Sequence, residues 1–198
     1  MFKFLITISL TFLLTGCFSL SSLDSINPFS EKEVKVNEKA EIEIPSDAPK
    51  WLEEKTIPNH ISAIGLVKNI DKKQIDSFKQ QALIGASNNL LKRIYLKTGR
   101  LYKAYTEKLD NPKVFDKDIK KFAEHIALKS LTYSTVKNSW IDESDDKNDL
   151  YLQIAVDTSK VAEQIQSTSK LLFVVDQMLY QHFLSNRANK EIIKYLED

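Results

Sequence analysis

Residues that usually carry chemistry are scarce in this chain, which has one cysteine, three histidines and four glycines among 198 residues. The sole cysteine, Cys17, has no partner for an internal disulfide. The histidines at 60, 125 and 182 are far apart and lack the spacing of metal ligands. Four glycines cannot build a phosphate-binding loop, and no Gly-x-Ser-x-Gly motif occurs. The sequence therefore predicts no catalytic centre, no cofactor and no metal site. Cys17 is the residue whose sequence context points most specifically to a chemical modification.

The segment before Cys17 has the three parts of a secretory signal. Lys3 precedes an apolar run over residues 4–14, and Leu-Thr-Gly-Cys follows at residues 14–17. A signal of this kind has a positive start, an apolar core of about 7–15 residues and a small-residue cleavage site. A membrane span needs about 20 apolar residues, more than are present here.

The four residues 14–17 resemble the signal of bacterial lipoproteins, in which cleavage occurs just before the cysteine. In that class the thiol receives a diacylglyceryl group and the new amine is acylated, and more than one lipid chain gives stable anchoring. The resemblance predicts that residues 1–16 are removed and that Cys17 is lipidated. The alternative is an ordinary secretory signal in which Cys17 is incidental. In bacterial lipoproteins an Asp after the cysteine favours retention at the inner membrane. Phe18 stands there in this chain, so the resemblance implies the outer membrane, on its periplasmic face or at the cell surface.

Residues 17–48 have the composition of a flexible tether, rich in Ser and charged residues and interrupted by prolines. Within it, Val36, Ile42 and Ile44 give some alternation, so residues 35–44 could form a short edge strand; a spacer is the favoured interpretation. The formal net charge is +1 and becomes zero without Lys3. Bulk charge therefore gives no reason to expect a nucleic-acid partner.

The folded region is expected to be an α+β domain over residues 49–157 with a helical extension over 158–198. Short apolar or alternating segments predict strands, and apolar residues at steps of three and four predict helices. We expect strands at 61–67, 131–141 and 150–157, and helices at 71–97, 115–129 and from 158 onward. Gly65 indicates close approach of a neighbouring backbone, and Gly99 is expected to end the first helix. The last strand should bury one face and leave the other more polar.

The expected C-terminal helix carries a stripe that steps by four and three residues, close to a heptad pattern. Its members are Val161, Ile165, Thr168, Leu172, Val175 and Leu179. As candidates for self-association or for packing on envelope proteins we take Val161, Ile165, Leu172, Val175 and Leu179. The alternative is that the stripe packs on its own domain.

One basic stretch is interleaved with aromatic residues and is a candidate ligand surface. Its key members are Arg100, Tyr102, Lys103 and Tyr105. In an exported protein this composition suits a glycan, an anionic headgroup or a protein surface. The favoured alternative is a solvated helix end with core tyrosines. Residues 142–149 are acidic but lack the glycine and terminal glutamate of an EF-hand loop, so they predict a solvated hairpin loop.

Several short motifs occur in an order that resembles one known family. They are Pro-Lys-Trp at 49–51, Ile-Ser-Ala-Ile-Gly at 61–65, Leu-Thr-Tyr-Ser-Thr-Val at 131–136, Trp-Ile-Asp at 140–142 and Tyr-Leu-Gln-Ile-Ala-Val-Asp at 151–157. Together with the signal ending at Cys17, this order is similar to the Lpp-twenty lipoprotein family of outer-membrane antigens in Helicobacter and Campylobacter relatives. The resemblance implies a small, largely antiparallel sheet with two helices on one face and no enzymatic activity. Some members are structural parts around the flagellar motor.

We therefore expect a non-enzymatic, lipid-anchored outer-membrane protein with a structural, assembly or interaction role in the cell envelope. Its partners would be the membrane, through Cys17, and either further copies of the chain or other envelope proteins. The alternative is a periplasmic module that binds a glycan or a small ligand through the Arg100–Tyr105 stretch.

Overall fold

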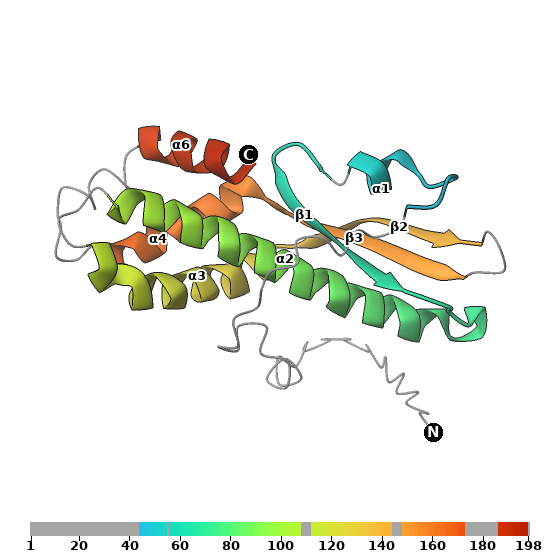
Figure 1. Ribbon diagram of the computed structural model, residues 1–198. Helices are drawn as coiled ribbons and strands as arrows, with labels where there is room; N and C mark the ends of the chain where they lie inside the picture. The colour runs from blue at the N-terminus through green and yellow to red at the C-terminus, as the bar shows by residue number, and fades with distance from the viewer. Residues whose placement is uncertain (1–43, 55, 108–111, 144–147, 173–185, 198) are drawn as a thin grey trace, which may run out of the picture. The chain divides into compact units, whose positions relative to one another are not determined.

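The computed structural model describes residues 44–54, 56–107, 112–143, 148–172 and 186–197 (Figure 1). The chain divides into two compact units, Met1–Asn37 and Glu38–Asp198, and all described residues belong to the second. The helices are α1 (Lys50–Glu54), α2 (Ile75–Thr106), α3 (Asp116–Leu131), α4 (Thr158–Leu172) and α6 (Asn186–Glu197). The strands are β1 (His60–Val67), β2 (Thr135–Asp142) and β3 (Asp149–Asp157), and two short 3-10 turns are η2 (Lys72–Gln74) and η3 (Pro112–Phe115).

The fold is α+β, as expected, and its centre is a three-stranded antiparallel sheet in the order β1-β3-β2. β3 is the middle strand, and every residue from Asp149 to Val156 is buried. The expectation that one face of this strand would be more polar is therefore wrong. Tyr151, Gln153 and Ala155 alternate with the apolar residues but are covered as well, because a second layer lies on their face of the sheet.

The first layer is α2, which lies against β1 and β3 with α3 beside it (Figure 1). Gly65 allows the close approach that the sequence predicted. A Cβ at this position would overlap the carbonyl oxygen of Ala82 and would lie 2.6 Å from the backbone nitrogen of Ala86. Ala82 and Ala86 are fully buried, so two small helix residues and one glycine bring the two backbones together.

The second layer covers the opposite face of the sheet and was not foreseen. Leu52 of α1 is fully buried and forms a cluster with Ile64 and Tyr151. The partly buried residues packed against this cluster are Ile44, Ala48, Trp51, Leu66 and Trp140. Ile44 and Ala48 fall inside the segment expected to be tether, so the packed part of the chain begins before Pro49.

α2 runs on to Thr106, and the expectation that Gly99 would end the first helix is wrong. A glycine inside a helix costs about 1 kcal/mol relative to alanine. Thr98, Leu101 and Tyr102 are all buried around it, and this burial outweighs the local cost. Residues 100–106, which include the basic stretch, are thus the last two turns of α2.

Residues 131–141 were expected to form a strand, but Leu131 ends α3 and residues 132–134 form the turn after it. Thr132, Tyr133 and Ser134 donate their backbone N–H groups to the carbonyls of residues 129, 130 and 131, at 3.2, 3.1 and 3.0 Å. β2 therefore begins only at Thr135. The C-terminal helices belong to the same compact unit, with α4 packed on α3 and α6 packed on α4.

Candidate functional site

The basic stretch considered as a ligand surface lies on the last two turns of α2. Arg100 and Lys103 are three residues apart, which places them on one helix face, and both are exposed. Their spacing presents two cationic groups to the same side of the helix. This pair can attract an anionic group. The two tyrosines of the stretch, Tyr102 and Tyr105, differ in how far they are exposed beside it.

Tyr102 is part of the core and not of a ligand surface. Its side chain is fully buried, and its hydroxyl donates a hydrogen bond of 3.1 Å to the carbonyl oxygen of Ile165 in α4. Burial raises the pKa of the hydroxyl above its usual value, so the group stays protonated and remains a donor. The assignment of Tyr102 to a ligand surface is wrong because the side chain connects α2 to α4.

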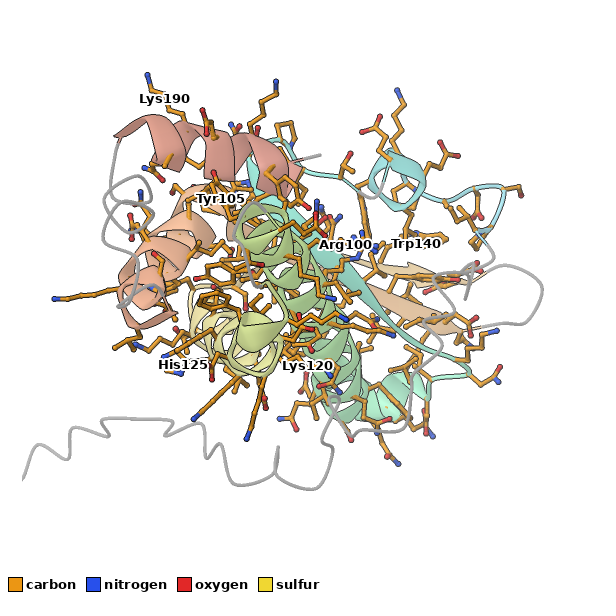
Figure 2. All side chains as sticks on the ribbon, turned by 60° about the vertical axis from the view of Figure 1, so that its left-hand side comes forward. Arg100, Tyr105, Lys120, His125, Trp140 and Lys190 are labelled. Carbon is orange, nitrogen blue, oxygen red and sulfur yellow. The ribbon has the colours of Figure 1, made fainter. Side chains whose placement is uncertain are left out.

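Tyr105 is half-buried and faces α6. Burial, and secondly the negative charge of Glu191 in α6, raise the pKa of its hydroxyl. Figure 2 places Tyr105 on the side of α2 nearer to α6, whereas His125 and Lys120 lie on α3 away from it. The tyrosine therefore borders a helix contact, and the exposed part of the stretch is reduced to Arg100 and Lys103.

The apolar stripe of the C-terminal helix is buried within its own chain over the part that is described. Val161 and Ile165 are fully buried, and Thr168 is buried too. Their helix, α4, packs on α3 and α6. The first two candidate interaction residues are therefore already covered, and assigning them to partner packing is wrong. The side chain of Leu172, and residues Val175 and Leu179, lie outside what the structure describes.

The acidic segment 142–149 is more buried at its ends than a solvated loop would be. Asp142 and Asp149 pair across the hairpin and are both buried. Asp149 accepts a hydrogen bond of 2.9 Å from the backbone N–H of Asn69, and Glu143 forms an exposed ion pair of 2.8 Å with Lys72. These contacts join the hairpin to the turn before α2. Among the described residues no group of His, Cys, Asp and Glu side chains is arranged to hold a metal ion.

Two polar residues of α2 have a role that the sequence analysis missed. Asn89 donates its side-chain amide to the carbonyl oxygen of Ile64 at 2.8 Å, and Arg93 donates to the carbonyl of Ser62 at 2.7 Å. Both carbonyls lie on the outer edge of β1, where unpaired backbone groups would otherwise attract another strand. The sequence offered one signal for this role. Asn89 and Arg93 are polar, lie four residues apart and follow the small residues Ala82 and Ala86 on the same helix.

The outer edge of β2 differs from that of β1. In the part of the chain that the structure describes, residues 135–141 have backbone hydrogen bonds only to β3. The side chains of Tyr133 and Val136 are about half exposed, at 49% and 54%. An edge of this kind is a surface on which another strand can pair.

Comparison with models of protein families and with curated proteins found no match to this chain. Cys17 lies outside the described residues. In the described ranges, no helix is both long and apolar enough to cross a membrane.

Proposed function

We propose that this chain is a lipid-anchored protein of the bacterial outer membrane, and that its folded unit acts by contact in the cell envelope and not by catalysis. The observation that carries the proposal is the sequence Leu-Thr-Gly-Cys at residues 14–17, which contains the only cysteine of the chain and follows a positively charged, apolar start. A cysteine that is both unique and placed at the cleavage position is best explained by lipidation.

The distance between Cys17 and the fold suits a protein that works away from the membrane surface. Twenty-six residues separate Cys17 from Ile44, the first residue that packs on the sheet. At most about 3.4 Å per residue, this length allows the folded unit to reach about 90 Å from the lipid. The resemblance to the Lpp-twenty family supports a structural role, which in some members is an association with the flagellar motor.

The burial of Tyr102 counts against a ligand surface at the end of α2, because its side chain packs inside the fold. Val161 and Ile165 are buried as well, so contact with a partner would use other residues on the outer surface. The partner in this proposal is an envelope protein or a further copy of the chain.

One observation supports a second candidate, a module that binds an anionic glycan or headgroup. Arg100 and Lys103 are exposed on one face of α2. Replacing both by Gln should abolish binding to an acidic glycan or to anionic vesicles if this candidate is correct, and should leave envelope assembly unchanged.

Anchoring is tested by fractionating cells that express the full chain or the Cys17→Ser variant. We expect the native chain in the membrane fraction and Cys17→Ser released into the periplasm, with Ser22→Ala as a control that stays with the membrane. Membrane recovery of Cys17→Ser equal to that of the native chain would contradict the proposal. Light scattering on the purified protein tests assembly, because a chain that remains monomeric at high concentration does not self-assemble.

A further inference from the structure

Exposed apolar side chains gather where the chain passes from α3 into β2. Leu128 in α3, Tyr133 in the following turn and Val136 in β2 are 39%, 49% and 54% exposed. Within the described ranges two other large apolar side chains are exposed, Ile84 of α2 and Leu171 of α4. Single exposed apolar residues are normal on a protein surface, whereas a group of them marks an interaction site. Leu128, Tyr133 and Val136 are called the apolar patch below.

The course of the chain keeps the three side chains of the apolar patch together. The backbone N–H of Tyr133 donates to the carbonyl oxygen of Ser130 at 3.1 Å. This hydrogen bond holds Tyr133 against the last turn of α3, to which Leu128 also belongs. Val136 follows three residues later, at most about 10 Å along an extended chain. The end of α3, the turn and the start of β2 thus form one continuous surface.

The sheet topology explains why Val136 is exposed. Val136 pairs with Ile154 of β3, and Gly65 of β1 pairs with Leu152 of the same strand. Paired residues share a face of a sheet, as do residues two apart on one strand. Val136 therefore lies on the face from which Gly65 contacts α2. Since α2 packs on β1 and β3, and β2 lies beyond β3 in the order β1-β3-β2, the start of β2 is left exposed.

The apolar patch is flanked by positive charge. Lys129 and Lys137 follow its first and last members in the sequence, and both are exposed. Residues 125–141 contain these two lysines and no aspartate or glutamate. The nearest acidic residues along the chain are Glu124, whose charge acts on a tyrosine of α2, and Asp142, which is buried. This surface therefore combines apolar side chains with two cationic groups.

We propose that the apolar patch, together with Lys129 and Lys137, binds the surface of a bilayer that contains anionic phospholipid. Apolar side chains on such a surface can enter the boundary between headgroups and acyl chains, and binding increases with the apolar area and the positive charge. A tyrosine is well suited to the membrane–water interface. A lysine keeps its charge among the headgroups while its aliphatic stem lies along apolar groups, and each lysine adds attraction to an anionic surface.

The size of the apolar patch favours lipid over a protein partner. A standard protein interface buries about 800 Å² on each partner and uses about 20–30 residues, whereas the patch offers three partly exposed apolar side chains. A second copy that docked patch to patch would also bring the lysines of both copies together. A bilayer has no fixed shape to match, so a few apolar side chains and two cations suffice.

The role of this contact in the cell rests on the proposed anchor at Cys17, whereas the affinity of the patch for lipid does not. A weak surface becomes effective when the folded unit is tethered to the same bilayer, because tethering gives a high effective concentration. The tether length of about 90 Å is an upper limit on reach, and the same tether lets the folded unit rest on the membrane. This contact would orient the unit with the junction of α3 and β2 toward the lipid.

The test is flotation of the purified chain with phospholipid vesicles. The chain used begins at residue 18, so it keeps the whole compact unit Glu38–Asp198 and lacks both Cys17 and the apolar signal. We expect it to bind vesicles made of equal parts phosphatidylcholine and phosphatidylglycerol. Binding to phosphatidylcholine alone should be weaker by at least about tenfold, and high salt should weaken binding to the anionic vesicles because it screens the lysines.

Variants of the exposed side chains locate the binding surface. Leu128→Gln, Tyr133→Ser and Val136→Thr together should weaken binding to the anionic vesicles by at least about tenfold, because they remove the apolar area. Lys129→Gln and Lys137→Gln should each weaken it about fivefold. None of the five side chains is buried, so all variants should remain folded, which thermal unfolding followed by circular dichroism checks.

Two control variants separate apolar exposure from charge. Leu171→Gln removes a side chain that is 65% exposed at the end of α4, and Arg100→Gln with Lys103→Gln removes two exposed cations of α2. Neither control should change vesicle binding. The proposal is overturned if the native chain does not bind the anionic vesicles, if the patch variants bind as tightly as the native chain, or if a control weakens binding as much as they do.

The other possible occupants are outcomes of the same design. The proposal is overturned if light scattering shows a dimer that the triple patch variant abolishes, because a second copy then covers the patch. It is also overturned if a crosslinker attached at residue 133 traps an acidic protein in cells and the chain leaves the vesicles unbound. Fractionation of Cys17→Ser does not enter this assay, so the anchoring proposal and the patch proposal fail separately.

Discussion

Replacing Gly65 by alanine should destabilise the fold more than any other glycine substitution in the described sheet and helices. The added Cβ would meet three backbone atoms of α2, the carbonyl oxygen and carbon of Ala82 and the nitrogen of Ala86. Backbone atoms cannot rotate away, so β1 and α2 must separate. Overpacking costs about 1–3 kcal/mol, and the upper end applies here. At about 2–4 °C per kcal/mol for a domain of this size, the melting temperature should fall by about 6–12 °C.

The two glycines of α2, Gly85 and Gly99, provide matched controls for this substitution. Nothing lies within 4 Å of a Cβ built at Gly99, and a Cβ at Gly85 would meet only the Gly65 Cα at 3.8 Å. Gly99→Ala should stabilise the helix by about 0.5–1 kcal/mol, and Gly85→Ala should not destabilise it. Thermal unfolding followed by circular dichroism measures all three variants. A Gly65→Ala protein that melts together with Gly99→Ala would refute the proposed packing of β1 on α2.

Three further predictions concern side-chain contacts. Asn89→Ala and Arg93→Ala should each lower the free energy of unfolding by about 1 kcal/mol, as measured by urea denaturation. Each should also increase aggregation, measured by turbidity, because the outer edge of β1 is then open to pairing with another strand. Unchanged turbidity would contradict the protection of this edge by the two side chains. Tyr102→Phe should cost about 1 kcal/mol at neutral pH. Burial raises the pKa of Tyr102 in the folded state, so native stability should fall above about pH 10, where the unfolded tyrosine ionises, and the variant should lack this part of the alkaline loss. The Asp157 carboxylate accepts hydrogen bonds from Ser159, which lower its pKa; its contribution should be complete above about pH 4 and be lost as the pH falls further. Asp157 precedes α4 and accepts from the backbone N–H of Ser159 at 2.7 Å, as an N-cap does. Asp157→Ala should cost about 1 kcal/mol at neutral pH, whereas Asp157→Asn should keep this hydrogen bond and lose the acid dependence, as measured by urea midpoints from pH 3 to 7.

The sequence predicted the features that depend on neighbouring residues or on small side chains. Alternation over residues 150–157 located β3, and the fold class is confirmed. Gly65 predicted a close backbone approach because few other residues permit one, and the structure confirms it. These features follow from local spacing and steric size, which can be read without knowing the partner element.

The predictions that failed concern features that depend on contacts between residues distant in the sequence. Gly99 would end an isolated helix, but buried Leu101 and Tyr102 carry α2 past it. Tyr102 was assigned to a ligand surface because its sequence neighbours are basic. Its hydroxyl instead donates a hydrogen bond to the carbonyl oxygen of Ile165, which is 63 residues away in the sequence. The layer formed by Ile44 and Leu52 covers a face of β3 that alternation alone predicts to be polar.

The most direct test of the proposed lipid anchor is the intact mass of the full-length protein after expression in bacterial cells. We expect a chain that lacks residues 1–16 and carries a diacylglyceryl group and an amide-linked acyl chain on Cys17. A mature chain with an unmodified Cys17 thiol, or one cleaved at another position, would contradict the proposed anchoring.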